Sequence, residues 1–210
     1  MVYDVAFCKA MLLYTAAQIK AHTEMLNDAD CMGDSDHGTG MAIGFTAVEN
    51  RLRSEAYSDL GSLFKACGMA ILMSAGGASG ALFGSFFKDG SKVLESHTVL
   101  DSQLFSHFLE AGVASVMRRG KASRGDKTMV DALLGASDCS QAHSDRPIVE
   151  LLELCAQAAK RASDATKEMK ASCGRMRTLS ERSIGFVDPG SISVAIILAS
   201  MASFSLSNQD

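Results

Sequence analysis

The chain has 210 residues, of which 47% are apolar and 21% are charged, and its formal net charge is -4 at pH 7. This composition fits one globular domain with a sizeable core and excludes a disordered or collagen-like chain. The acidic balance excludes the broad basic surface that duplex nucleic acid and acidic membranes require, since phosphate contacts need clustered lysine and arginine. We therefore expect a single domain over residues 1–210, with no nucleic-acid or membrane partner. A small anionic ligand is compatible with this charge.

The cysteines and the N-terminal segment bear on the compartment. The six cysteines form no CxxC pair, and several occupy apolar helical positions, which is typical of small core residues in a reducing compartment. Asp4, Lys9 and the polar residues from Thr15 onward interrupt any signal-peptide pattern. The longest apolar run, residues 192–204, is too short to span a bilayer. These features predict a cytoplasmic protein.

Apolar residues recur at helical spacing along almost the whole chain, without strand alternation. In the first segment the period runs through Val5, Cys8, Leu12, Ala16 and Ile19. In chain order the pattern predicts helices over residues 3–27, 38–54, 58–74, 80–95, 101–118, 127–138, 147–169 and 190–205. The sequence therefore predicts an all-α fold.

Prolines and glycines mark the breaks between these segments. Pro147 has a fixed φ and no N–H, so it suits a first helical turn, whereas Pro189 between Asp188 and Gly190 indicates a loop. Glycines cluster in the segments 33–40, 76–80, 120–125 and 174–190. Because glycine permits positive φ and close backbone approach, these breaks predict either ordinary helix C-caps or turns that gather around one ligand.

The first turn segment contains the strongest chemical pattern, an acidic stretch. In an extended segment, residues two apart project to the same side, so Asp34 and Asp36 would present both carboxylates to one hard cation. Asp30, near the end of the first helix, adds a third carboxylate. Few carboxylates with room for water favour Mg²⁺ completed by phosphate oxygens. The alternative is that Asp36 caps the next helix and the other aspartates are solvated. His37 follows, with an ordinary pKa suited to a hydrogen-bonding or a catalytic role.

The second pattern is a run of small residues from Ser74 to Gly80 that enters an apolar helical segment. A glycine-rich turn at a helix start exposes successive backbone N–H groups and the positive end of the helix dipole, which together bind phosphate without a lysine. No GK[ST] follows, so the motif is not a Walker A loop. The alternative is close helix packing through small residues.

Two basic segments follow, residues 118–129 and residues 174–190. Their arginines and lysines could neutralise or clamp phosphoryl oxygens, or they could form charged turns and surface ion pairs of little energetic consequence. Taken residue by residue, the chain is an all-α protein with a candidate Mg²⁺ and phosphate site, and no substrate is specified.

Together these segments resemble the ADP-binding L subunits of bacterial dihydroxyacetone kinases and the matching domain of single-chain dihydroxyacetone kinases. The resemblance runs in order through five blocks, residues 33–38, 76–84, 119–121, 125–133 and 181–190. Five separated blocks in the right order are more specific than any one block. The family usually has three residues between its first metal aspartate and the glycine that matches Gly33, whereas two residues separate Asp30 from Gly33 here. Asp30 therefore aligns with that aspartate only when a one-residue gap is allowed, and Ala29 aligns with it otherwise. Gly40 stands where the family commonly has Asn.

The resemblance implies a barrel of eight antiparallel helices with ADP or ATP in a hollow at one end. It implies two Mg²⁺ ions that are held by Asp30, Asp34 and Asp36 and bridge to the nucleotide phosphates. The residues that it places around the nucleotide are His37, Gly38, Thr39, Gly40, Gly77, Ala78, Ser79, Gly120, Thr128, Met129, Arg175, Asp188, Pro189 and Gly190. Among all of these, the expected catalytic residues are Asp34, Asp36, His37 and Arg175.

The implied activity is phosphoryl transfer to a hydroxyl of dihydroxyacetone or another short ketose, with protein groups supplying position and charge neutralisation. The family holds that substrate on a separate K subunit, so the chain is expected to be inactive alone. In the phosphoenolpyruvate-driven form, ADP stays bound and is recharged by a phosphohistidine on an M subunit. A homodimer is left open.

Two other functions would account for part of this pattern. The first is an ADP-occupied regulatory module that binds a transcription factor or a sister subunit without catalysis. The second is an all-α prenyl-diphosphate enzyme, which would account for the aspartates but leaves the glycine-rich and basic loops unexplained. It would also place aspartate clusters on helices that flank an apolar tunnel.

Overall fold

The computed structural model describes residues 2–209, apart from the side chains of residues 175 and 176. Over this range the chain forms α-helices and short 3-10 helices, with no strand, which confirms the predicted all-α class. The α-helices are α1 (Val5–Ala21), α2 (Thr23–Ala29), α3 (His37–Ser54), α4 (Leu60–Ser74), α5 (Gly77–Gly90), α6 (Ser102–Gly120), α7 (Met129–Ala142), α8 (Ile148–Ala165) and α9 (Pro189–Ser207). The 3-10 helices are η1 (Ser91–Leu94), η2 (Thr166–Glu168) and η3 (Arg175–Ser183).

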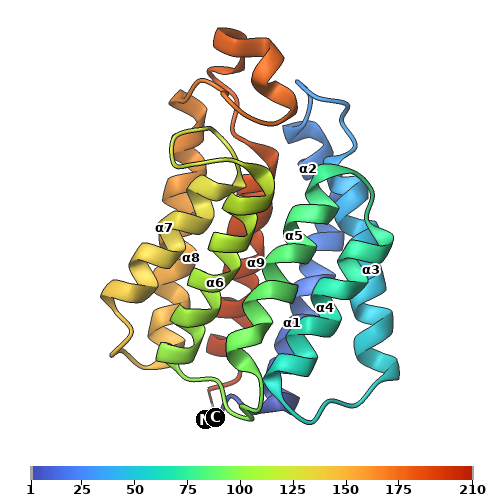
Figure 1. Cartoon of the computed structure of the whole chain (residues 1–210), viewed down its shortest axis with the longest axis vertical. Helices are drawn as coiled ribbons and strands as arrows, with labels where there is room; N and C mark the ends of the chain where they lie inside the picture. Colours follow the sequence, from blue (N-terminus) through green and yellow to red (C-terminus); the bar gives the residue numbers. More distant parts are fainter. Residues whose placement is uncertain (1, 210) are drawn as a thin grey trace.

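The long helices run alternately up and down and pack in a closed ring (Figure 1). From α3 onward each helix packs against the next, and α1 packs against both α3 and α9, which closes the ring. α2 continues from the upper end of α1 and packs against α3. Both termini lie at the lower end in Figure 1, whereas α3, α5, α7 and α9 all begin at the upper end. This ring is compatible with the implied barrel of eight antiparallel helices.

Several helix boundaries differ from the predicted ones. The predicted helix 3–27 is two helices, because polar side chains at the junction bond to the backbone in place of the helix ladder: His22 Nδ1 lies 2.7 Å from Gln18 O, and Thr23 Oγ1 donates to Lys20 O over 2.7 Å. Pro147 is the N-cap of α8, just before its first turn. Pro189 opens α9, where its missing N–H costs nothing, so the predicted loop there is wrong.

The other helix ends show smaller differences. α5 begins three residues before the predicted helix 80–95, at Gly77. α8 stops at Ala165, and η2 covers the remainder of the predicted helix 147–169. The 3-10 helix η3 lies in a polar segment for which the sequence predicted no helix.

Aspartates begin four of the long helices. The side chains of Asp4, Asp59 and Asp101 accept hydrogen bonds of 2.8 Å from the N–H three residues ahead, and Asp188 accepts one of 2.7 Å from Ser191 N. Each bond satisfies a helix N–H that lacks an intrahelical acceptor, and the negative charge lies at the positive end of the helix dipole.

A cluster of phenylalanines fills the ring between α4, α5 and α6. The ring centroid of Phe108 lies 4.9 Å from that of Phe64 and 5.2 Å from that of Phe86, both in edge-on geometry. Phe87 and Phe105 complete the cluster, and all five side chains are buried. Edge-to-face pairs add to the free energy gained from burial alone, so this cluster stabilises the packing of α4, α5 and α6.

α4 and α5 approach each other closely because glycines face each other at their contact. A Cβ on Gly68 would overlap the backbone nitrogen of Lys88, and a Cβ on Gly84 would overlap the side chain of Leu72. The alternative of close helix packing through small residues therefore holds for Gly68 and Gly84. The small residues at the start of α5 have a different place, which is described with the site below.

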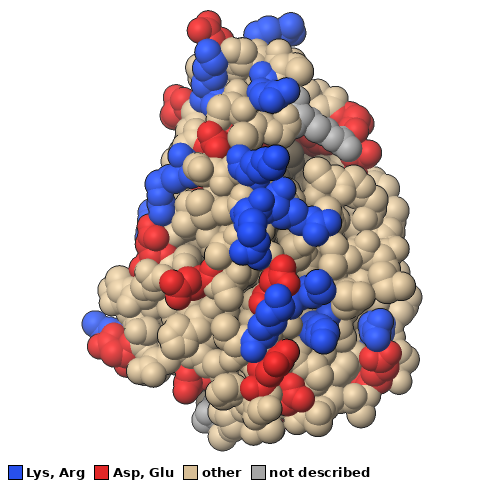
Figure 2. Space-filling model, viewed as in Figure 1, with Lys and Arg blue, Asp and Glu red and all other residues tan. Residues whose placement is uncertain are grey.

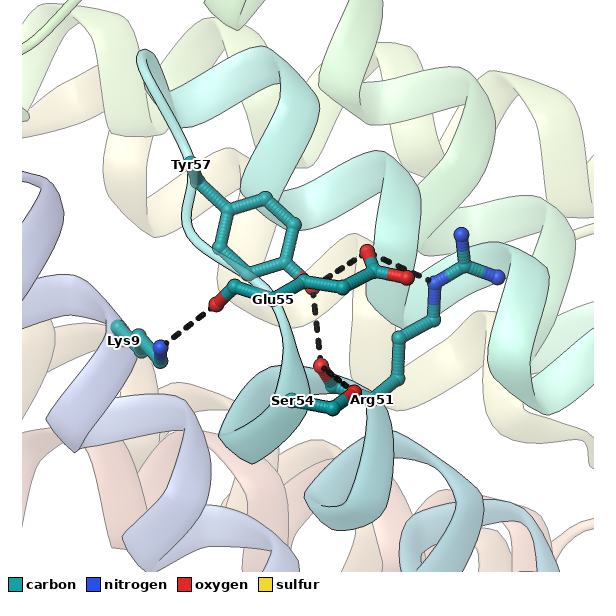
Figure 3. Close-up of polar contacts among 5 residues, drawn as sticks. All are labelled: Lys9, Arg51, Ser54, Glu55 and Tyr57. Carbon is teal, nitrogen blue, oxygen red and sulfur yellow. Dashed lines mark hydrogen bonds and ion pairs between the residues drawn. The ribbon is translucent and has the colours of Figure 1, made fainter.

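A polar contact network fixes the lower end of α3 (Figure 3). Lys9 Nζ on α1 donates to the carbonyl of Glu55 over 2.9 Å, and its ammonium lies 5.7 Å from the ring centroid of Tyr57. The Tyr57 hydroxyl donates to Arg51 O over 3.3 Å, and Ser54 Oγ donates to the same carbonyl. The chain exit from α3 is thereby held to α1, far from the upper end.

α9 is long and apolar enough, by length and composition, to cross a membrane, although the apolar run within it is shorter. In the structure 56% of its most apolar window is buried, and the helix packs against α1, α7 and α8. Its apolar surface is therefore used for packing within the ring.

Substitution of Gly68 tests the close α4–α5 contact. We expect Gly68→Ala to lower the free energy of unfolding by about 1–3 kcal/mol, because the added methyl group meets backbone atoms that cannot rotate away. Gly40→Ala is the matched control, since a Cβ there meets no atom within 4 Å and alanine favours the helix by about 0.5–1 kcal/mol. Urea unfolding of both variants measures the effect, and equal stabilities would contradict the close contact.

Candidate functional site

A cavity of about 360 Å³ lies at the upper end of the ring, where four helices begin. Its wall takes Asp36, His37, Thr39 and Gly40 from the start of α3, Gly76 to Ser79 from α5, Thr128 and Met129 from α7, and Asp188 to Gly190 from α9. The first turn of a helix presents N–H groups and the positive end of its dipole. Four such ends around one cavity make it a site for an anion such as a phosphate chain.

Three carboxylates lie together at this cavity. One oxygen from each of Asp30, Asp34 and Asp36 can be chosen so that all three lie within 4.8 Å of one another. Asp30 is only 6% exposed, whereas the other two are exposed. Clustered carboxylate oxygens with an open side suit a hard cation that completes its shell with water or phosphate, so this cluster fits Mg²⁺.

The backbone brings the carboxylates together differently from the predicted extended segment. Residues 30–36 form a turn in which Gly33 N donates to Asp30 O over 2.8 Å and Ser35 has a left-handed φ of 55°. A Cβ on Gly33 would overlap the Asp30 carboxylate, so any other residue there would displace this carboxylate from its place in the cluster. Asp36 occupies the N-cap of α3, but its side chain makes no capping hydrogen bond. The capping alternative is therefore not what the structure supports.

His37 joins three of the helix starts. Its Nδ1 lies 3.1 Å from Ser79 Oγ on α5, and its Nε2 lies 2.8 Å from Ser193 Oγ on α9. Burial lowers the pKa of the imidazole to about 4, so the ring is neutral at pH 7. The expectation of a near-neutral pKa was wrong, because sequence gave no sign that this residue is buried.

The start of α5 has the form predicted for a phosphate-binding turn. Its N-cap is Gly76, which has no side chain to accept the first helical N–H groups. Gly77 has a positive φ of 74°, which turns the chain from α4 into α5. Gly77, Ala78 and Ser79 all line the cavity, so the backbone donors of this turn lie at its wall.

Asn27 positions the start of α3 and was not identified from the sequence. Its Oδ1 accepts a 3.0 Å hydrogen bond from Thr39 N, and its Nδ2 lies 3.1 Å from Thr39 Oγ1. A Cβ on Gly38 would overlap the carbonyl of Thr23, so α2 and α3 meet closely here. Gly38 lies behind the cavity wall, and a lone asparagine in a helix gives no sequence signal for this role.

Asp131 closes the loop before α7. Its Oδ1 accepts a 2.6 Å hydrogen bond from Gly125 N, and its Oδ2 accepts one of 2.9 Å from Thr128 N. The Thr128 hydroxyl in turn accepts from Val130 N and from Asp131 N, so the Thr128 and Asp131 side chains form a reciprocal capping box. The buried Asp131 carboxylate thereby fixes Thr128 and Met129 at the cavity wall.

The remaining predicted site residues lie elsewhere or outside the described atoms. Gly120 ends α6 next to the side chain of Leu82 and does not line the cavity. Asp34 lies in the carboxylate cluster, and the cavity wall does not include it. The side chain of Arg175 is outside the described part of the structure. Wall residues that the site prediction did not include are Ile43, Gly76, Leu82, Phe83, Lys127, Cys173 and Gly174, of which the apolar ones read as core.

The basic loop after α6 is mostly a charged surface. Lys and Arg side chains gather on the upper half of the face in Figure 2. Arg118, Arg119, Lys121 and Arg124 are exposed, and Arg124 pairs with Asp138 at 2.7 Å. Exposed pairs of this kind contribute little to stability, as the surface alternative for this loop expects.

Asp188 carries the most perturbed carboxyl at the cavity wall. Burial raises its pKa to about 7, with Asp131 and Asp30 adding to the shift and Ser191 N and Lys127 opposing it. When a carboxyl has a higher pKa in the folded protein than in the unfolded chain, the free energy of unfolding falls as pH rises between the two pKa values. The reason is that the unfolded chain releases the proton first. Asp188 therefore makes the empty cavity less stable at neutral pH.

Asp188→Asn tests this in metal-free buffer. We expect its free energy of unfolding, relative to wild type, to rise between about pH 4 and pH 7, because asparagine keeps the N-cap and removes the titration. Asp59→Asn is the control: its free energy of unfolding relative to wild type should stay constant above about pH 4, because the Ser62 N–H lowers the pKa of the Asp59 carboxyl and this carboxyl is ionised in both folded and unfolded chains over the range. Urea unfolding across this range measures both, and a constant difference for Asp188→Asn would contradict the expectation.

Comparison with known proteins places the chain. Residues 31–203 match the DAK2 domain. The chain is 33% identical over 205 residues to the PEP-dependent dihydroxyacetone kinase 1, ADP-binding subunit DhaL, of Listeria innocua, which covers 96% of this chain and 97% of that protein. It is 36% identical over 173 residues to the PEP-dependent dihydroxyacetone kinase, ADP-binding subunit DhaL, of Escherichia coli, covering 81% and 82%.

A solved structure shares the fold. The dihydroxyacetone kinase from C. freundii in complex with AMP-PNP and Mg²⁺ superimposes with a TM-score of 0.74 at 24% identity, covering 97% of this chain and 34% of that one. At this identity the likeness establishes the helical architecture. The sequence matches show that the chain belongs to the DAK2 domain family, a family of phosphotransferases that includes the ADP-binding subunits of dihydroxyacetone kinases.

Proposed function

We propose that this chain is the nucleotide-binding phosphoryl-transfer subunit of a kinase that acts on dihydroxyacetone or another short ketose. The observation that carries the proposal is the cluster of Asp30, Asp34 and Asp36 beside a cavity that four helix N-termini surround. A polyphosphate needs cations on one side and N–H donors on the other, and this arrangement offers both. The relatives named as ADP-binding subunits support the same assignment.

The three aspartates would hold Mg²⁺, for which we propose two ions. Mg²⁺ supplies neutralisation of the phosphate charge when it is bound. The buried Asp30 carboxylate fixes one side of the cluster, and the exposed Asp34 and Asp36 face solvent. The relative whose structure contains AMP-PNP and Mg²⁺ supports this pairing of metal and nucleotide.

The rest of the cavity suits ADP or ATP. Backbone N–H groups at Gly77 to Ser79, Met129 and Gly190 would donate hydrogen bonds to phosphate and ribose oxygens. Ile43, Leu82, Phe83 and Met129 supply an apolar part of the wall where a nucleobase can lie. Gly120 would border this part from behind Leu82.

The proposed catalytic residues act by position and charge. Asp34 and Asp36 hold the cation, and Arg175 would clamp the transferred phosphoryl group. His37 is neutral, so it orients Ser79 by hydrogen bonding and supplies no positive charge. We propose a cytoplasmic protein in which ADP stays bound as a fixed cofactor and is recharged by a phosphohistidine-bearing M subunit, while the ketose is held on a K subunit.

Nucleotide titration tests the site directly. We expect the purified chain to bind ADP only when Mg²⁺ is present, and Asp34→Ala with Asp36→Ala to weaken that binding at least about tenfold, since removal of even an outer group of a metal site costs this much. Asp28→Ala, which removes an exposed carboxylate outside the cluster, is the control and should bind as wild type does. Calorimetry with stripped protein measures the affinities. Binding that is equal with and without Mg²⁺ would contradict the assignment.

Reconstitution tests the subunit assignment. We expect no phosphoryl transfer to dihydroxyacetone by the chain alone, and transfer when the K and M subunits and phosphoenolpyruvate are added, because the cavity would supply the nucleotide site and the K subunit would hold the ketose. Formation of the ketose phosphate is the measurement. Tight ADP binding without turnover in the full mixture would favour the regulatory module instead.

A further inference from the structure

Lys127 is a buried lysine at the cavity wall to which the proposed function assigns no role. Its side chain is 1% exposed, and it lies directly before Thr128, the N-cap of α7. Its backbone has a left-handed φ of 58°. An ammonium is costly to bury unless its protons are hydrogen-bonded, and a left-handed non-glycine residue adds strain. The hydrogen-bond partners of this ammonium therefore indicate what the residue does.

The ammonium of Lys127 ties two distant segments together. Its Nζ donates to the carbonyl of Thr166, just after α8, and to the carbonyl of Phe186, two residues before Asp188, each over 2.5 Å. Its charge also attracts the Asp188 carboxyl. The left-handed φ directs the side chain away from its own loop and across to the segment that leads into α9.

Behind these carbonyls lies a buried polar network that reaches Asp188 from two sides. Thr166 Oγ1 accepts the Asp188 N–H over 2.9 Å and donates to Ser163 O over 2.6 Å. Ser163 Oγ lies 2.8 Å from Ser191 Oγ, and Ser191 N donates to Asp188 Oδ2 over 2.7 Å. Thr166, Ser163 and Ser191 are all buried. Asp188 is therefore held at its backbone and at its carboxyl by one connected set.

We infer that Lys127 is a positioning residue for nucleotide binding, which sets the Asp188-Pro189-Gly190 turn by holding the carbonyls of Thr166 and Phe186. The inference rests on the proposed nucleotide site, since that turn forms the α9 side of the cavity. Without the ammonium, the buried carbonyl of Thr166 and the partly buried carbonyl of Phe186 lose their donor, and the segment has to shift to find other partners. The turn then loses the place from which its N–H groups meet the ligand.

The test compares ADP affinity at saturating Mg²⁺ for the full chain and for Lys127→Met and Thr166→Val. We expect each variant to raise the Kd about tenfold, as removal of a group behind a binding residue typically does. The double variant should lose less than the product of the two effects, because both residues act through one network. Lys160→Met removes an exposed lysine that pairs with Asp164 and should leave the Kd unchanged.

Each outcome decides the inference. If wild type binds no ADP, the proposed function fails and this inference fails with it. If wild type binds and Lys127→Met binds equally well, Lys127 has no positioning role. If Lys127→Met weakens binding but Thr166→Val does not, the lysine acts by its charge on the phosphates and the positioning role is wrong. If Lys127→Met does not fold, Thr166→Val decides whether the network that holds Asp188 N sets the turn, since it carries no charge change; a Kd equal to that of wild type would then overturn the inference.

Amide hydrogen exchange separates positioning from general stability. We expect Lys127→Met, when folded, to speed exchange at residues 186–190 while the amides of α4 stay as protected as in wild type. A merely structural lysine would lower protection of α4 and of this turn together and leave the Kd of the folded protein unchanged. Equal loss of protection in both segments would overturn the inference.

Discussion

The site depends on the direction of the helices in the ring. Because neighbouring helices alternate, α3, α5, α7 and α9 all start at one end, and the positive ends of their dipoles face one cavity. This concentrates positive potential without any basic side chain in the wall except Lys127 among the residues that the structure describes. The same alternation brings the termini and the α3 exit held by Lys9 to the opposite end, so that the packing of the lower half and the chemistry of the upper half are separated.

The acidic groups at the upper end lie close to these helix N-termini, which attract them, and close to one another, so that they also repel each other. Asp188 satisfies α9 as its N-cap, yet burial and the neighbouring carboxyls hold its pKa near 7. Asp30 is buried in the carboxylate cluster. Clustered carboxylates repel each other, and a divalent cation bound between them would neutralise their charge and remove that repulsion. These repulsions lower the free energy of unfolding. A ligand that binds only the folded state would raise it again.

The sequence predicted the fold class and most helices because their apolar residues recur at helical spacing, and it predicted α9 within a long apolar run. It missed the α1–α2 break, since that depends on the side chains of His22 and Thr23 bonding to the backbone. It grouped Asp34 and Asp36 correctly, but through an extended segment, where the structure has a turn set by Gly33 and Ser35. Lys127 read as part of a charged turn, because its partners lie 39 and 59 residues away and leave no local pattern.

The groups with chemical reactivity in the cavity wall are held in unreactive states. Both ring nitrogens of His37 lie at hydrogen-bonding distance from serine hydroxyls, and burial raises the pKa of the Cys173 thiol, so the thiol keeps its proton. A wall of backbone donors, carboxylates and a buried ammonium has no activated nucleophile in it among the described side chains. Such a wall favours direct transfer, in which catalysis comes from alignment and from neutralised charge. A displaced binding group then lowers the rate much as a missing one does. This is why Lys127, which is remote from the carboxylate cluster in sequence, can affect nucleotide binding through the position of the Asp188-Pro189-Gly190 turn.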